Sequence, residues 1–239
     1  MSNPTAALEN ATYDSRESRN QFIANHLGDY IGRSVLNVGG GGKLYLAQYL
    51  PDNIEYVEMD VSGEPHYKLN LEQDLPLPIE DRAFETVICT EVLEHVDNFH
   101  DVFSELLRVS SKWLIISLPN CLNGIDAYFL NSKRYQTKKA GITRGSHLKF
   151  YGLPAFPPDD RHKWFFSYSE AEAFFRYHES PERYRIVTTF PTGLVTTSRR
   201  ENLKRRLLRT FLSRDSFYNL YSASFWCVLD VSRGEAGTR

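Results

Sequence analysis

Strand-like and helix-like patterns alternate along most of this chain. Short runs of apolar and β-branched residues, each typical of a buried strand, occur at 35–38, 54–59, 86–89, 113–118, 184–189 and 223–231. Apolar residues at helical spacing predict helices at 18–30, 44–50 and 99–107, and another that begins near Ser167, where Glu170 completes a capping box. Alternation of this kind is typical of an α/β fold with a mostly parallel sheet.

The first apolar run ends in four consecutive glycines, Gly39 to Gly42. Glycine has no Cβ, so the backbone there can adopt a positive φ and approach a ligand closely. Together with the apolar pattern at 44–50, the run predicts strand, turn and helix. Ligands of open α/β sheets bind beyond the carboxyl ends of such strands, so we expect a binding site at this turn.

The glycine run does not fit the common nucleotide-binding fingerprints. In the dinucleotide pattern Gly-x-Gly-x-x-Gly, the third glycine would fall on Leu44 or Tyr45, depending on the frame. The Gly-Lys-Ser/Thr of a phosphate-binding loop is also missing from the sequence. A dinucleotide-dependent oxidoreductase is therefore disfavoured.

The second predicted strand ends in carboxylates. Asp60 follows it at about the spacing at which a carboxylate accepts hydrogen bonds from ribose hydroxyls. Glu58 is the alternative, since it points to the same face but lies deeper in the strand.

The stretch 34–42 resembles the first motif of class I S-adenosylmethionine-dependent methyltransferases, in which an apolar strand and an acidic residue precede Gly-x-Gly-x-Gly. Gly39 and Gly41 match the first two glycines, with Gly40 between them. Asn37 stands where the family has an acidic residue, and Lys43 stands where it has the third glycine. The resemblance implies that S-adenosyl-L-methionine is the cofactor.

Two later stretches extend the resemblance. The stretch 68–78, aligned by its Leu-Pro pair, places Asn70 and Leu71 at the adenine, and Val61 follows the ribose-binding Asp60. The string Thr90-Glu-Val-Leu-Glu-His-Val96 is similar to that of the type-11-like branch, which methylates small molecules. By resemblance, Thr90, Glu91 and Val92 pass under the cofactor.

Two histidines are candidate catalytic bases, because an unperturbed imidazole titrates near neutral pH. His95 belongs to the string just described, and the alternative is that Glu94 and His95 brace the loop. His162 precedes the predicted helix start at Ser167, and its alternative is a buried, hydrogen-bonded histidine. The segment 121–164 is rich in aromatic and basic residues, and we expect it to be a lid or acceptor-binding insertion.

Composition and charge narrow the class of protein. The chain has 239 residues and a formal net charge of −2, so no global field attracts nucleic acid, and we predict no nucleic-acid partner. Its three scattered cysteines favour a reducing compartment and show no metal-ligand spacing. With no secretory signal or long apolar span in the sequence, we predict a cytoplasmic protein without a metal site.

Two helical stretches bear on partners. Residues 199–214 form a basic amphipathic pattern, which suits contact with an anionic membrane surface or, alternatively, packing of its leucines on the core. Tyr13, Arg16 and Arg19, near the predicted helix 18–30, are candidates for contact with a ligand carboxylate; a solvated helix face is the alternative.

We therefore expect one methyltransferase domain over 1–239. Its parts are a helical lead-in at 1–33 with a loose start at 1–12, a cofactor-binding core at 34–120, an acceptor-side insertion at 121–168, and C-terminal helices and two strands at 169–239. The expected fold is α/β: a Rossmann-like, seven-stranded mixed sheet, last strand antiparallel, with helices on both faces. The implied function is methyl transfer to a small molecule, such as a sugar or lipid-linked saccharide precursor. The alternative is a non-catalytic scaffold on the same fold, which the amides Asn37 and Asn70 and the cation Lys43 favour.

Overall fold

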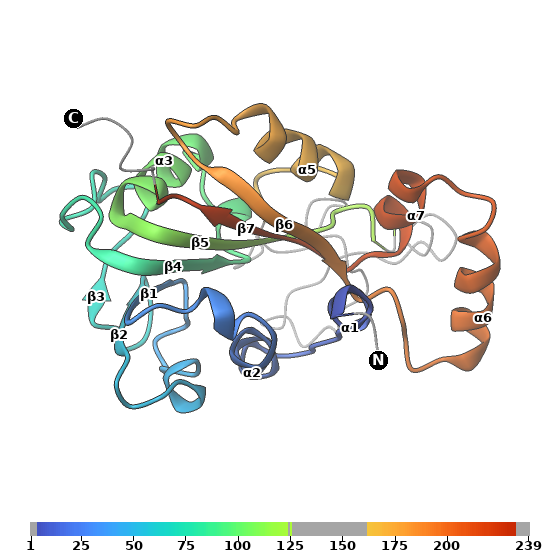
Figure 1. The fold of residues 1–239 in the computed structure, drawn as a ribbon, viewed down its shortest axis with the longest axis horizontal. Helices are drawn as coiled ribbons and strands as arrows, with labels where there is room; N and C mark the ends of the chain where they lie inside the picture. Colours follow the sequence, from blue (N-terminus) through green and yellow to red (C-terminus); the bar gives the residue numbers. More distant parts are fainter. Residues whose placement is uncertain (1–3, 124, 126–161, 233–239) are drawn as a thin grey trace, which may run out of the picture.

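A seven-stranded mixed sheet forms the centre of the protein, in the order β3-β2-β1-β4-β5-β7-β6 (Figure 1). The computed structural model describes residues 4–123, 125 and 162–232. The strands are β1 (Ser34–Val38), β2 (Glu55–Asp60), β3 (Tyr67–Lys68), β4 (Phe84–Thr90), β5 (Ser110–Pro119), β6 (Arg185–Thr192) and β7 (Ser224–Asp230). β1 to β5 are parallel, whereas β7 is antiparallel to both of its neighbours, as the sequence predicts.

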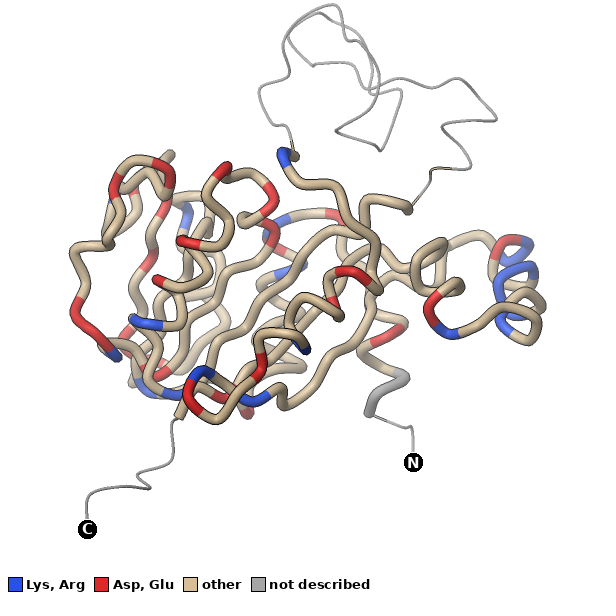
Figure 2. The backbone as a smooth tube through the Cα atoms, turned by 90° about the horizontal axis from the view of Figure 1, so that it is seen from above, with Lys and Arg blue, Asp and Glu red and all other residues tan. Residues whose placement is uncertain are grey.

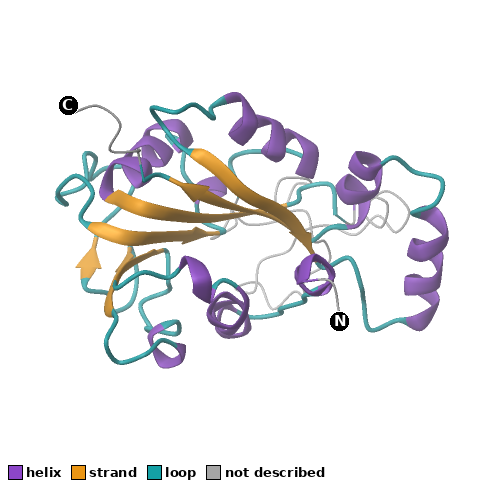
Figure 3. Ribbon diagram, in the orientation of Figure 1, coloured by secondary structure: helices purple, strands orange, loops and turns teal. Residues whose placement is uncertain are grey.

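Helices cover both faces of this sheet (Figure 3). The α-helices are α1 (Pro4–Asn10), α2 (Arg16–His26), α3 (Phe99–Val109), α5 (Tyr168–Tyr177), α6 (Arg199–Leu208) and α7 (Arg214–Tyr221), and the short 3-10 helices are η1 (Gly28–Tyr30), η2 (Ala47–Tyr49) and η3 (Leu93–His95). α3 and α5 lie on one face, α1 and α2 lie on the other, and α6 and α7 extend beyond the end of the sheet (Figure 1). Within the described residues, no helix has the length and apolar character that would let it cross a bilayer.

Side-chain alternation along the strands divides the core between the two faces. Leu36 and Val38 of β1 pack in the cluster beneath α3 and α5, while Val35 packs in the cluster beneath α2. All three cysteines, Cys89, Cys121 and Cys227, are buried free thiols. Burial raises the pKa of each thiol above its usual range, that of Cys121 to about 12.

The helix predicted at 44–50 is wrong. Only the single 3-10 turn η2 forms there, and Leu46 is buried without an α-helix around it. Gly42 and Leu44 both have positive φ, at 66° and 51°, so the backbone cannot enter a right-handed helix at this point. The apolar spacing at 44–50 suggested a helix, but the positive φ angles of the turn prevent one from forming there.

The loose lead-in expected at 1–12 is also wrong within its described part. α1 packs beside β6, and the carbonyl oxygens of Glu9 and Ala11 accept hydrogen bonds from Leu194 and Gly193. The Glu9 carboxylate also accepts a hydrogen bond of 2.8 Å from the Tyr218 hydroxyl. These contacts fasten the start of the chain to its C-terminal half.

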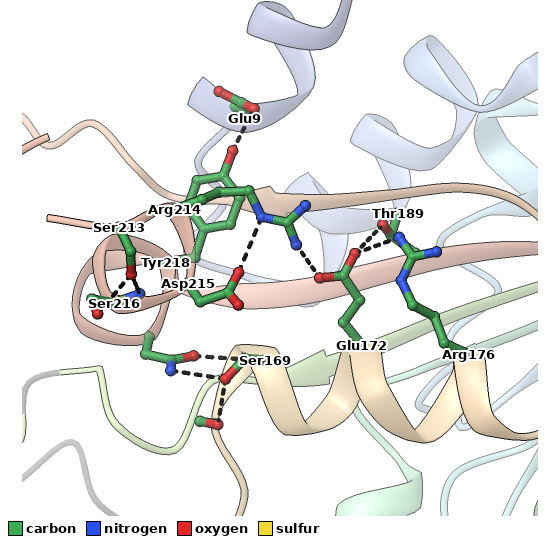
Figure 4. Close-up of polar contacts among 12 residues, drawn as sticks. Glu9, Ser169, Glu172, Arg176, Thr189, Ser213, Arg214, Asp215, Ser216 and Tyr218 are labelled. Atoms are coloured by element: carbon green, nitrogen blue, oxygen red, sulfur yellow. Dashed lines mark hydrogen bonds and ion pairs between the residues drawn. The ribbon is translucent and has the colours of Figure 1, made fainter. Parts of the chain in front are cut away.

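A group of ion pairs joins α5 to α7 (Figure 4). Glu172 on α5 is buried and accepts hydrogen bonds from Arg176, Arg214 and Thr189. The helical extension beyond the sheet is therefore held to the body by charged contacts.

The predicted capping box at the start of α5 is confirmed, because Ser167 and Glu170 each bond to the backbone N–H of the other.

Glu105 and Arg108 of α3 fasten the loop before β4. The Glu105 carboxylate accepts bonds of 2.8 Å from the Arg108 guanidinium and of 2.8 Å from the Leu77 N–H. Arg108 also donates to the carbonyl oxygens of Leu77 and Ile79. Its guanidinium holds the pKa of Glu105 below the ordinary value of 4.5.

We predict that Glu105→Gln lowers the free energy of unfolding at pH 7 by about 1–2 kcal/mol, the usual effect of losing a charged hydrogen-bond pair. Because the folded pKa is depressed, this stabilisation is present above about pH 4.5 and is lost as pH falls through the folded pKa. Urea unfolding at pH 7 and pH 3 measures it, with exposed Glu182→Gln as the control. A variant that is destabilised equally at both pH values would contradict this account.

Candidate functional site

A cavity of about 590 Å³ lies beyond the carboxyl ends of β1, β2 and β4. Its volume is in the range of small-molecule sites. Nine candidate residues from the sequence line it: Arg16, Gly39, Asp60, Val61, Asn70, Leu71, Glu91, Val92 and His95. Side chains that are distant in sequence therefore meet at the predicted edge of the sheet.

The described lining differs from the prediction at other positions. Asn37, Gly40, Gly41, Thr90 and His162 do not line the cavity, although each lies next to a residue that lines it or contacts one. Sequence reasoning missed Val38, Met59, Ser62, Leu69, Glu72, Val96 and Lys163. Glu72 and Ser62 lie within two residues of predicted positions in the sequence, and this proximity could have indicated them. Lys163 belongs to a distant segment of the chain.

Asp60 holds the glycine turn in place. One of its carboxylate oxygens accepts a 2.8 Å hydrogen bond from the Gly41 N–H, and the other accepts bonds of 2.8 Å from the N–H and hydroxyl of Ser62. A carboxylate has about four lone-pair positions, so the oxygen bonded to Gly41 can accept a further donor from the cavity. Asp60 thus supports the turn and faces the ligand space.

Glu58, the alternative ribose-binding residue, lies beneath the turn and outside the cavity lining. It is fully buried and accepts a 2.7 Å hydrogen bond from the Tyr56 hydroxyl, which accepts a 2.9 Å bond from the Asn37 amide. A Cβ on Gly40 would lie 2.5 Å from the Glu58 carboxyl carbon. The chain from Asn37 to Glu58 therefore packs directly against the turn, and its geometry favours Asp60 for the ligand.

Two glycines of the turn permit close backbone approach. Gly39 has φ of 74°, and a Cβ there would lie 2.1 Å from a Val92 methyl group. Gly42 has φ of 66°, and its Cβ would lie 2.5 Å from the Ser62 carbonyl oxygen. The turn is thus in contact with the segments after β2 and β4, which closes the floor of the cavity.

Glu91 connects the cavity to helix α2. Its carboxylate pairs with Arg19 at 3.2 Å and accepts a 2.6 Å hydrogen bond from Ser224 of β7. Burial and the nearby Glu91 charge raise the pKa of Tyr13 to about 12. Arg16 lines the cavity and lies against Gly41, so α2 covers the site and its arginines are not simply a solvated face.

Asn70 uses part of its amide within its own loop. Its side-chain oxygen accepts a 3.0 Å hydrogen bond from the Glu72 N–H, and its own N–H donates a 2.6 Å bond to Asp74. An adenine amino group would therefore have to share this oxygen with the Glu72 N–H. The side-chain NH₂ of Asn70 is a hydrogen-bond donor and can bond to a nitrogen of the adenine ring.

Glu94, His95 and His162 meet at the edge of the cavity. Nε2 of His95 lies 3.6 Å from a Glu94 carboxylate oxygen, and Nε2 of His162 lies 3.9 Å from the same oxygen. The two imidazole rings are nearly perpendicular, with centroids 4.8 Å apart. The two predicted base candidates, 67 positions apart in the chain, are thus brought together around one buried carboxylate.

Comparison with known proteins finds one similar family. Residues 34–113 match the family model described as "Methyltransferase domain", of type 11. The part of the chain that carries the glycine turn, Asp60 and Glu91 is therefore similar to a type-11 methyltransferase domain. No curated protein matches the chain at a significant level.

Solved structures share the fold of the protein at low sequence identity. A SAM-dependent methyltransferase from Archaeoglobus fulgidus is 14% identical, with a TM-score of 0.56 over 90% of this chain and 94% of that one. The small RNA methyltransferase HEN1 is 13% identical, with a TM-score of 0.54 over 97% of this chain and 28% of that one. The [4+2]-cyclase SpnF is 12% identical, with a TM-score of 0.51 over 95% and 88%. Proteins of this fold are therefore named for different reactions, so the acceptor must be inferred from the site.

We predict that Asp60→Asn lowers the affinity of the protein for S-adenosylmethionine and S-adenosylhomocysteine by roughly 10–100-fold, because a charged acceptor is replaced by a neutral amide. Isothermal titration calorimetry with both ligands measures it, and circular dichroism tests whether the glycine turn still folds. Exposed Asp52→Asn is the matched control. An unchanged dissociation constant in a folded Asp60→Asn variant would exclude Asp60 from the cofactor site.

Proposed function

We propose that the protein is an S-adenosylmethionine-dependent methyltransferase that binds its cofactor in the cavity at the ends of β1, β2 and β4 and methylates an oxygen of a small-molecule acceptor. The observation that supports the cofactor position best is the convergence there of Gly39, Asp60 and Glu91 from three separate strand ends. When bound, S-adenosylmethionine supplies an electrophilic methyl group on a sulfonium.

The residues of the cavity divide by chemistry. We assign Asp60 to the ribose hydroxyls, and Val61, whose side chain is 63% exposed, to one face of the adenine with Leu71 near it. Asn70 donates to the adenine ring. We assign Gly39, Glu91 and Val92, which line the cavity, to the floor under the amino-acid part of the cofactor, with Gly40, Gly41 and Thr90 supporting them from behind.

The acceptor enters on the side of His95 and His162. Lys163 lies there too and is held by Glu72 and Asp97, while His95 lines the cavity itself. We propose that this group of polar side chains positions the acceptor nucleophile in line with the methyl group, where correct orientation supplies most of the rate acceleration.

We infer that the acceptor is a sugar or a lipid-linked saccharide precursor. Support comes from the basic and aromatic composition of residues 121–164, most of which lie outside the described residues, and from the apolar face of α6. The three buried thiols suit a reducing compartment, and we propose the cytoplasm.

Methyl transfer from radiolabelled S-adenosylmethionine tests the acceptor class. Nucleotide sugars and polyprenyl-linked saccharides are expected to be labelled, whereas quinones, amino acids and small RNAs are not. Labelling of only the latter set would overturn the acceptor proposal. Cofactor binding without turnover on any acceptor would support the alternative, a non-catalytic scaffold on the same fold.

α6 and the residues that follow it, 209–212, present apolar and basic side chains to solvent. Leu203, Leu207 and Phe211 are 70%, 61% and 77% exposed. Exposed basic residues surround them: Arg199, Arg200, Lys204, Arg206 and Arg209. Lys and Arg gather at this projecting end of the molecule (Figure 2). Only Leu208 and Leu212 of the pattern pack on the core, so we propose that α6 contacts an anionic membrane surface peripherally.

We predict that the protein co-sediments with phosphatidylserine-containing vesicles and not with pure phosphatidylcholine vesicles. The double change Leu203→Glu and Leu207→Glu is expected to reduce the bound fraction at least tenfold, because it removes apolar area and adds negative charge. Tyr177→Glu, at an exposed aromatic residue of α5, is the control. Equal binding of the double variant and the control would exclude α6 as the membrane contact.

A further inference from the structure

The group formed by Glu94, His95 and His162 has the composition of a metal site. One carboxylate and two imidazoles offer ligand atoms that all lie within 4.8 Å of one another. Two histidines with one carboxylate bind first-row divalent ions in proteins and leave positions open for water or substrate. Cysteine spacing gives no sign of this group, because the group contains no cysteine and its second histidine comes from a distant segment.

The spacing of the three side chains leaves room for an ion. The Glu94 oxygen is 3.6 Å from His95 and 3.9 Å from His162, and both distances exceed a direct hydrogen bond. Metal–ligand bonds of about 2.0–2.2 Å place two ligand atoms at separations of this order. Small side-chain rotations would bring all three atoms around one ion.

Burial shields the three side chains from bulk water. The Glu94 side chain is only 1% exposed, while His95 and His162 are 29% and 11% exposed. Buried carboxylates in proteins are commonly bound to metal ions or paired with cations.

The segment that carries His162 is anchored to the segment that carries Glu94. The Lys163 N–H donates a 2.7 Å hydrogen bond to the Glu94 carbonyl, and the Trp164 indole donates a 2.7 Å bond to the Val96 carbonyl. The Lys163 side chain bonds to Asp97 at 2.9 Å. These bonds fix the approach of the two histidines, as a preorganised ligand set requires.

We propose that Glu94, His95 and His162 bind a divalent first-row metal ion, such as Mn²⁺, Co²⁺ or Zn²⁺, at the acceptor side of the cavity. This proposal rests on the proposed function, in which the acceptor enters beside His95. The ion holds the acceptor oxygen and lowers the pKa of its proton, so the histidines act as ligands and not as bases. In the transfer the acceptor proton passes to water, the O–CH₃ bond forms, and the C–S bond breaks with its electron pair left on sulfur.

Titration of the full-length, EDTA-treated protein with Mn²⁺ and with Co²⁺ tests the site. Electron paramagnetic resonance counts bound Mn²⁺, and the visible spectrum of Co²⁺ reports nitrogen ligation. We expect one ion per chain, and at least tenfold weaker binding in His162→Ala and in Glu94→Gln. His26→Ala, at an exposed histidine of α2, is the control and should bind as the unmodified protein does.

Calorimetry with S-adenosylhomocysteine separates this proposal from the function on which it rests. We expect the metal-binding variants to retain cofactor affinity, with or without EDTA, because Asp60 and the glycine turn are unchanged. Equal ion binding by unmodified protein and folded His162→Ala would overturn the metal site. If the unmodified protein does not bind S-adenosylhomocysteine, the assignment of the cavity to the cofactor is wrong. The ion titration then still decides, independently, whether the metal site exists.

Discussion

The parallel register of β1, β2 and β4 is the constraint on which the site depends. β1 pairs Asn37 with Glu58 of β2 on one side and Val38 with Cys89 of β4 on the other. The three strands therefore end at one level, and the residues that follow them converge on the cavity. Because side chains alternate along a strand, a slip of β2 by one residue would turn Glu58 and Asp60 to the opposite face.

The same register explains how the protein accommodates an amide at the position where the methyltransferases that it resembles carry an acid. Asn37 is paired across the ladder with Glu58, and Tyr56 bridges their side chains by hydrogen bonds. An acidic side chain thus lies beneath the glycine turn, but it comes from the neighbouring strand. The acidic residue that is missing at position 37 therefore has a counterpart one strand away, which weakens the case for a scaffold that has lost its cofactor.

The fold and much of the cavity could be predicted from local patterns of residues. Gly39 and Asp60 could be predicted because a glycine run after a strand, or a carboxylate at the end of one, is recognised from a few adjacent residues. The helix at 44–50 could not be corrected from periodicity, since it depends on the positive φ of Gly42, where the backbone packs directly against the segment after β2. The meeting of His162 with Glu94 depends on the return of the chain after a long insertion, which no spacing rule gives.

The three buried cysteines can serve as natural probes of local opening in three different regions of the protein. Cys89 lies in the central sheet, Cys227 in the antiparallel strand, and Cys121 at the root of the insertion, where its N–H bonds to the Phe166 carbonyl. A buried thiol with a raised pKa reacts with alkylating reagents only when its surroundings open. The rate at which each cysteine is labelled therefore reports the opening free energy of a different region, without any introduced residue.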